Sequence, residues 1–198
     1  MGLDLDYTDG QTPLEQEEID GLIIPTIATR VELDEFEQQN IEKAVQWTLS
    51  RSFKSEAIFR EEFIRRLHTK MYGDVWSWAG EFRKTNKNNG VDWWKIPFQL
   101  KYLLDDAIYW HKNGTFPADE IAIRFKHRIV SIHCFSNGNG RHSRLMADII
   151  IEKIFKKPIF SWGAYSLSNE GDTRKAYLRA LKAADNGEYK LLMDFARS

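Results

Sequence analysis

The sequence predicts a mainly α-helical domain that contains one β-hairpin. Apolar residues recur with the spacing of amphipathic helices over most of the chain. A polar stretch that ends in Asn89-Gly90 interrupts them and separates two β-prone pieces, which is a hairpin signal. The length of 198 residues is enough for one substantial core, so we expect a single domain.

The N-terminal part of the chain, residues 1–31, shows no sustained apolar period and contains turn-forming Gly and Pro residues. It is predicted to lie as an extended arm on the surface of a domain formed by residues 32–198. The first helix of that domain is expected over residues 34–49, where apolar residues follow a loose helical spacing. A second helix is expected from Ser55 to Met71, because Ser55 suits an N-cap and large apolar side chains then recur every four positions.

The hairpin is predicted in residues 83–95, since Asn89-Gly90 favours positive φ at both turn positions. Adjacent residues of a strand face opposite sides, so one of Trp93 and Trp94 is expected to be exposed. Five further helices, each with a periodic apolar stripe, are expected over residues 96–113, 117–132, 141–155, 172–185 and 188–196.

Composition excludes several kinds of protein. The formal net charge is −1, so the overall charge does not indicate a nucleic-acid or membrane surface. A single cysteine, Cys134, excludes an internal disulfide framework and a multi-cysteine zinc site. No apolar run has the length of a membrane span, and the first residues lack the pattern of a secretory signal. We therefore expect a cytoplasmic protein that binds neither membranes nor nucleic acid directly.

A dense run of polar and small residues, His-Cys-Phe-Ser-Asn-Gly-Asn-Gly-Arg-His-Ser-Arg, lies between two predicted helices. Gly138 and Gly140 stand where the second helix begins, so unpaired backbone N–H groups and the absence of Cβ atoms favour a bound phosphate. Arg141 and Arg144 are three residues apart and can both reach a polyphosphate. His133 precedes this cradle and can accept a proton near neutral pH. Together these residues indicate phosphoryl or nucleotidyl transfer.

The run resembles the signature of the Fic family, His-Pro-Phe-x-(Asp/Glu)-Gly-Asn-Gly-Arg-x-x-Arg, and differs from it at two fixed positions. The similarity continues in the Trp-x-Trp-Ala-Gly segment of residues 76–80 and in residues 177–187. Residues 2–14 further resemble the Fic subgroup called mobile mystery protein B. The resemblance covers about residues 30–196. It implies a Fic fold, which is a helical bundle with a β-hairpin flap beside the active-site loop.

The activity that this resemblance implies is that of a toxin-like or regulatory bacterial adenylyltransferase. Such an enzyme moves AMP from ATP to a Ser, Thr or Tyr hydroxyl of a target protein. His133 would be the catalytic base, Phe135 would anchor the loop in the core, and the target would dock on the flap of residues 83–95. The residues that bind the nucleotide phosphates would be Gly138, Asn139, Gly140, Arg141 and Arg144.

Two departures from the signature leave other functions open. Cys134 replaces a proline, which removes a φ constraint. Asn137 replaces the acidic residue that in the family helps to hold Mg²⁺, and a neutral amide is the weaker ligand for that ion. The alternatives are a catalytically weak or inactive nucleotide-binding interaction module, or a Fic transferase of another nucleotide or of a phosphoryl group.

Regulation and partners also follow only from the resemblance. Many Fic proteins are restrained by a glutamate in the pattern (Ser/Thr)-x-x-x-Glu-(Gly/Asn), which residues 166–171 match with Glu170. The subgroup implies a separate inhibitory or helix-turn-helix partner, mobile mystery protein A. His142 occupies a variable position of the signature and is expected to face solvent.

Overall fold

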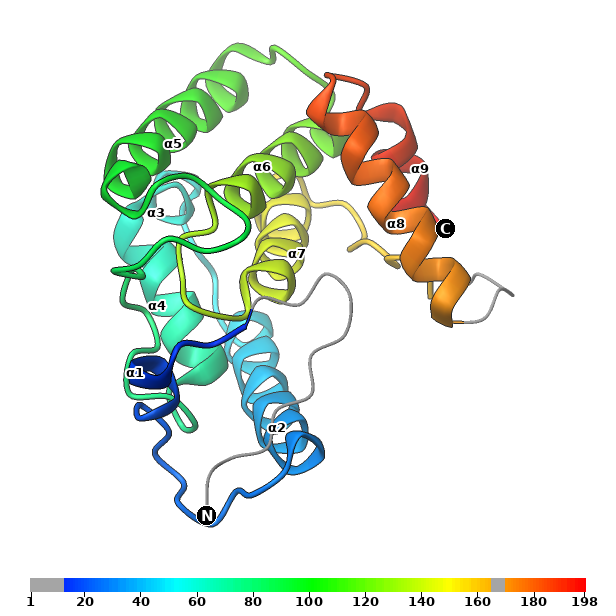
Figure 1. The fold of residues 1–198 in the computed structure, drawn as a ribbon. Coiled ribbons are helices and arrows are strands. Elements are labelled where there is room, and N and C mark those ends of the chain that lie inside the picture. Colours follow the sequence, from blue (N-terminus) through cyan, green and yellow to red (C-terminus); the bar gives the residue numbers. More distant parts are fainter. Residues whose placement is uncertain (1–12, 165–169) are drawn as a thin grey trace.

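The computed structural model describes residues 13–164 and 170–198, and these residues form a mainly helical domain, as predicted (Figure 1). A short 3-10 helix, η1 (Trp93–Lys95), and a π-helical turn, η2 (Ile150–Ile154), accompany the α-helices. The α-helices are α1 (Gln16–Ile19), α2 (Arg30–Leu49), α3 (Ser55–Ile58), α4 (Glu61–Tyr72), α5 (Ile96–Asn113), α6 (Ala118–Ile132), α7 (Asn139–Ile149), α8 (Glu170–Asp185) and α9 (Lys190–Arg197).

The central pair of helices is α6 and α7, which pack against each other and are joined by the loop that carries the signature (Figure 1). Helix α5 packs on α6, α2 packs on α4, and α8 pairs with α9. The apolar faces that meet in this arrangement bury large side chains such as Phe125 and Leu67. Among the described residues, no helix combines the length and the apolar character that crossing a bilayer requires.

The helix predicted from Ser55 to Met71 is in fact two helices. Helix α3 ends at Ile58 because Phe59 leaves the helical region (φ −90°, ψ 40°) and Arg60 is extended (φ −120°, ψ 148°). Both Phe59 and Ile58 are buried, so the kink places two neighbouring apolar side chains in the core. A four-residue apolar period therefore predicted the buried side chains correctly but not the break between the helices.

The predicted β-hairpin is not present: residues 83–95 form a loop that ends in η1, without strand pairing. The backbones of its two halves bond to the end of α6 and the start of the signature loop, and the side chain of Asn86 connects the two halves. The amide of Arg83 donates to the carbonyl of Cys134 at 3.0 Å, and the amide of Val91 donates to the carbonyl of Ile132 at 3.3 Å. Trp93 and Trp94 are both exposed, because a 3-10 helix does not alternate faces as a strand does.

The part of the N-terminal arm that the structure describes is tied to the domain. Its backbone pairs with the segment after α4, where the amide of Ile23 donates to the carbonyl of Val75 at 2.8 Å. The indole of Trp78 donates to the carbonyl of Glu18 at 2.8 Å. These bonds hold the arm, which includes the single helical turn α1, against the domain and beside the loop of residues 83–95.

Candidate active site

A cleft of about 770 Å³ brings together most of the residues that the sequence singled out. One wall is formed by residues from the loop and the start of α7, namely His133, Asn137, Gly138, Asn139, Gly140, Arg141 and Arg144. Four residues of α8 also line the cleft, namely Tyr177, Leu178, Leu181 and Asp185. This size is in the range of small-molecule sites. The lining is mostly polar and charged, and its apolar side chains are Val130, Leu178 and Leu181.

His133 is the C-cap of α6 and adopts the left-handed conformation (φ 58°, ψ 63°), which is uncommon for a residue other than glycine. Its backbone is fixed in this conformation because its carbonyl accepts a 2.6 Å hydrogen bond from Nε of Arg83. Burial, together with the nearby cations of Arg83 and Lys87, lowers the pKa of the His133 imidazole to about 4, against the opposite effect of a hydrogen bond to Val130. The imidazole is therefore neutral at pH 7 and can accept a proton.

The two glycines of the loop differ in what they do. Gly138 is the N-cap of α7 with φ 76°, and a Cβ atom there would lie 2.4 Å from the Tyr72 ring. It is required by both backbone conformation and packing. A Cβ atom at Gly140 would meet no protein atom within 4 Å, because that side of Gly140 opens into the cleft. Gly140 thus keeps space free at the N-terminus of α7, where backbone N–H groups attract anions.

Side chains within the loop hold it in shape. Phe135 is fully buried and stacks on the ring of His68 with centroids 3.8 Å apart. The amide of Asn139 closes the turn, since its Oδ1 accepts from the backbone N–H of Phe135 at 3.0 Å and its Nδ2 donates to the carbonyl of Phe135 at 2.7 Å. The Asn139 side chain therefore braces the loop, and only its backbone is available to an anion.

His142 and Cys134 are both buried, and for His142 the predicted exposure is wrong. Its Nε2 lies 3.1 Å from the carbonyl of Ile64, so the imidazole pins α7 to α4, and burial lowers its pKa to about 4. Burial also raises the pKa of the Cys134 thiol to about 12, which leaves it protonated and unreactive. The sequence gave no sign that His142 is buried, because position 142 is variable in the signature.

The two arginines of the signature have different surroundings. Nη2 of Arg141 lies 2.5 Å from Oε2 of Glu37, a carboxylate on α2 whose side chain is completely buried. The Arg141 guanidinium also lies over the Tyr72 ring, 5.3 Å from its centroid. Arg144 lines the cleft, and within the described part of the chain it has no ion-pair partner. Arg141 is thus held by a buried carboxylate, whereas Arg144 faces the space that a polyphosphate would occupy.

Glu37 belongs to the site, although no motif in the sequence indicated it. It lies on the buried face of α2, where every third or fourth side chain is inaccessible, and Asn40 follows it there. A polar pair on the apolar stripe of a helix is the signal that could have identified it, because buried charges are paired or functional.

The surroundings of Asn137 do not fit a metal ligand. Its Oδ1 accepts from the backbone N–H of Gly138 at 2.7 Å, and its Nδ2 donates to Oε1 of Glu37 at 3.3 Å. Both ends of the amide are therefore engaged by the protein. Across the described residues, no group of three or more His, Cys, Asp or Glu side chains converges on a point where an ion could bind.

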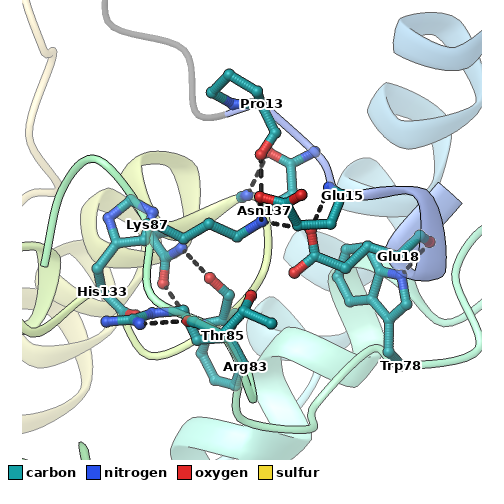
Figure 2. A network of polar contacts seen from close by, with 12 residues as sticks. Pro13, Glu15, Glu18, Trp78, Arg83, Thr85, Lys87, His133 and Asn137 are labelled. Atoms are coloured by element: carbon teal, nitrogen blue, oxygen red, sulfur yellow. Dashed lines mark hydrogen bonds and ion pairs between the residues drawn. The ribbon is translucent and has the colours of Figure 1, made fainter. Parts of the chain in front are cut away.

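The loop of residues 83–95 lies against the active-site loop and the arm (Figure 2). A Cβ atom at Gly90 would lie 2.5 Å from Cβ of His133, so a glycine with φ 102° permits this approach. On the other side of the loop, Nζ of Lys87 lies 2.5 Å from Oε2 of Glu18 and 3.2 Å from the carbonyl of Pro13, both in the arm. The Lys87 side chain is only 2% exposed, so this ion pair forms the buried connection between arm and loop.

Helix α8 is connected to α6 by a second buried lysine. Lys126 donates to the hydroxyl of Tyr177, and its ammonium lies 4.5 Å from the centroid of the same ring. Burial and, to a smaller extent, the charge of Arg144 lower the pKa of Lys126 to about 7. Helix α8 begins at Glu170, but the side chain of the predicted regulatory glutamate lies outside the described residues, as do residues 165–169.

Residues 58–151 match the model of the Fic/DOC family, a segment that runs from the end of α3 into η2 and contains the whole signature.

Solved structures of Fic proteins have the same fold. Fic-1 of C. elegans (residues 134–508, E274G) superposes with a TM-score of 0.68 at 20% identity and covers 90% of this chain, which spans 51% of that one. The BepC effector of Bartonella tribocorum, solved with bound AMPPNP, gives a TM-score of 0.68 at 15% identity over 92% of this chain and 97% of its own. A Fic domain of a putative cell filamentation protein from Bartonella quintana, solved with bound ADP, gives 0.65 at 16% identity over 87% and 86%. At these identities the likeness establishes the fold.

Proposed function

This chain belongs to the Fic/DOC family, and on that premise we propose that it is a protein adenylyltransferase, which transfers AMP from ATP to a hydroxyl side chain of a target protein. The observation that carries the proposal is the cleft, where a neutral imidazole, an open helix N-terminus and the side chain of Arg144 face one space. The nucleotides in the BepC and B. quintana structures support a nucleotide as the ligand of this fold.

The reaction follows from the placement of these groups. The hydroxyl oxygen of the target forms a bond to the α-phosphorus of ATP while its proton passes to the unprotonated ring nitrogen of His133. The bond between the α-phosphorus and the oxygen that bridges to the β-phosphorus breaks, and pyrophosphate leaves. Backbone N–H groups at Gly138–Gly140 stabilise the charge that develops on the α-phosphate, while Arg141 and Arg144 hold the outer phosphates.

The target is proposed to dock on the loop of residues 83–95, because this loop borders His133 and carries the exposed Trp93 and Trp94. Residues 83–95 contain no strand, so we expect recognition through side chains rather than through strand addition. A helix-turn-helix partner and a restraint by Glu170 remain proposals that derive from the resemblance alone.

The test is intact-mass analysis of the protein and of a lysate after incubation with α-labelled ATP, with wild type compared to His133→Ala. We expect an AMP-sized gain that His133→Ala abolishes. The matched control is His111→Gln, a histidine substitution on α5 outside the cleft, which should retain the transfer. Label transfer that survives in His133→Ala would rule out the assigned base.

The second candidate is a nucleotide-binding module with little turnover, which the engagement of both ends of the Asn137 amide favours. It predicts tight binding of AMPPNP with no label transferred under any condition. A transferase of a different group would instead give a mass gain of another size on the same target.

A further inference from the structure

Glu37 is a buried carboxylate with three protein partners around the proposed site. Its Oε1 accepts from the indole N–H of Trp76 at 2.7 Å and from Nδ2 of Asn137 at 3.3 Å, and its Oε2 pairs with Nη2 of Arg141 at 2.5 Å. Its side chain has no exposed surface, whereas that of Arg141 is 31% exposed. Glu37 therefore cannot touch a ligand in the cleft, but it controls two residues that line it.

Stability alone does not account for this carboxylate. A buried ion pair contributes little relative to apolar side chains of similar size, because desolvation offsets the attraction. The neighbouring positions on the same face of α2 include Leu33 and Ala44, so an apolar residue would suit the environment. What Glu37 adds is orientation, since it occupies one edge of the Arg141 guanidinium and leaves the remaining donors available to a phosphate.

The neutral residue at position 137 follows from the same contact. Because Glu37 already presents a carboxylate 3.3 Å from the side-chain nitrogen of Asn137, an acid at position 137 would set two carboxylates against each other. An amide instead donates to Glu37 and still accepts from the N–H of Gly138 at 2.7 Å. The signature's usual acid would therefore be incompatible with Glu37.

We propose that Glu37 is a positioning residue of the nucleotide site, which supplies from α2 the negative charge that position 137 lacks and holds Arg141, and that Glu37 and Asn137 form one exchangeable acid–amide pair. The inference rests on the proposed function as far as the nucleotide is concerned. The pairing of the two residues does not depend on it.

A melting comparison tests the pairing without any nucleotide. Asn137→Asp should destabilise the protein, because it faces Glu37 with a second carboxylate. Adding Glu37→Gln should then raise the melting temperature above that of Asn137→Asp alone, since the amide and the acid have exchanged places. A double variant that melts no higher than Asn137→Asp would overturn the exchangeable pair.

Binding of AMPPNP, measured by titration calorimetry, tests the positioning role. Glu37→Gln should weaken binding about tenfold, because Arg141 loses its charged partner and its fixed orientation. The matched control is Asn40→Ala, one turn further along α2, whose side chain bonds only to the backbone of Lys70 and Asp74. It should lower the melting temperature while retaining wild-type affinity.

The outcomes separate the two proposals. Equal affinity losses in Glu37→Gln and Asn40→Ala, or none in Glu37→Gln, would overturn the positioning role. A wild-type protein that does not bind AMPPNP would refute both the nucleotide site and the positioning role, but the melting comparison would still decide the acid–amide pair. If Glu37→Gln alone does not fold, the double variant replaces it and should bind AMPPNP more tightly than Asn137→Asp.

Discussion

Two irregular segments meet at the cleft, and they are held in different ways. The loop of residues 133–140 closes its own turn through the Asn139 side chain, which bonds to the backbone of Phe135, four residues away, and His68 and Arg83 add outside contacts. The loop of residues 83–95 is shaped by partners far along the chain, such as Glu18 for Lys87. Conformations fixed by near neighbours can be predicted from a short motif, whereas those fixed by distant side chains cannot. Four substitutions test this difference between the two loops.

The largest effect is expected from Gly138→Ala, which attacks the locally encoded loop. The methyl group would lie 2.4 Å from the Tyr72 ring, at a residue with φ 76°. We expect a loss of about 4 kcal/mol in the free energy of unfolding, measured in urea. Gly114→Ala is the control, because Gly114 also has a positive φ of 58° but open space around it. Only the cost of placing alanine in the left-handed conformation, about 1 kcal/mol of unfolding free energy, should be lost.

The next effect is expected from Arg83→Met, which attacks the loop that depends on distant contacts. Arg83 is 2% exposed and donates to the carbonyls of Thr85, Val91 and His133. Methionine fills the space but leaves these acceptors without a donor, so we expect a loss of about 3 kcal/mol in urea unfolding. Limited proteolysis should then cut within residues 83–95, and cleavage elsewhere first would contradict the assignment. Lys84→Met, an exposed neighbour, should change neither measurement.

The sequence predicted the helices α4 to α7 and the placement of the signature because periodicity and glycine positions are local properties. It did not predict the break at Phe59, since the apolar period continues through it. It failed at the hairpin because Arg83 offers the backbone other partners than a strand, and it missed Glu37 because its partner Arg141 is distant in sequence. The burial of His142 likewise depends on the carbonyl of Ile64, on another helix.

Acid should weaken the contact that holds α7, which follows the first loop, against α4, because this contact is made by the neutral imidazole of His142. Burial lowers the pKa of His142 to about 4, below the unfolded value of about 6.5. The unfolded chain therefore binds more protons between these values, and the contribution of His142 is complete above pH 6.5 and lost as the pH falls towards 4. Between pH 7 and pH 5 wild type should lose about 2 kcal/mol more than His142→Gln, whose amide can still donate to Ile64 but does not titrate. Parallel pH profiles of the two proteins in urea unfolding would contradict this view.

The smallest effect on stability is expected from Gly140→Ala. This substitution distinguishes the stability of the first loop from its proposed role in binding phosphate. A methyl group at Gly140 meets no protein atom within 4 Å, and alanine favours helix, so the melting temperature should be unchanged or slightly higher. The same methyl group would enter the space above the start of α7, where a phosphate is proposed to contact backbone N–H groups. AMPPNP affinity in titration calorimetry should therefore fall about tenfold or more. If the affinity is retained, the phosphate lies elsewhere in the cleft, and Arg144 rather than the helix N-terminus dominates its binding.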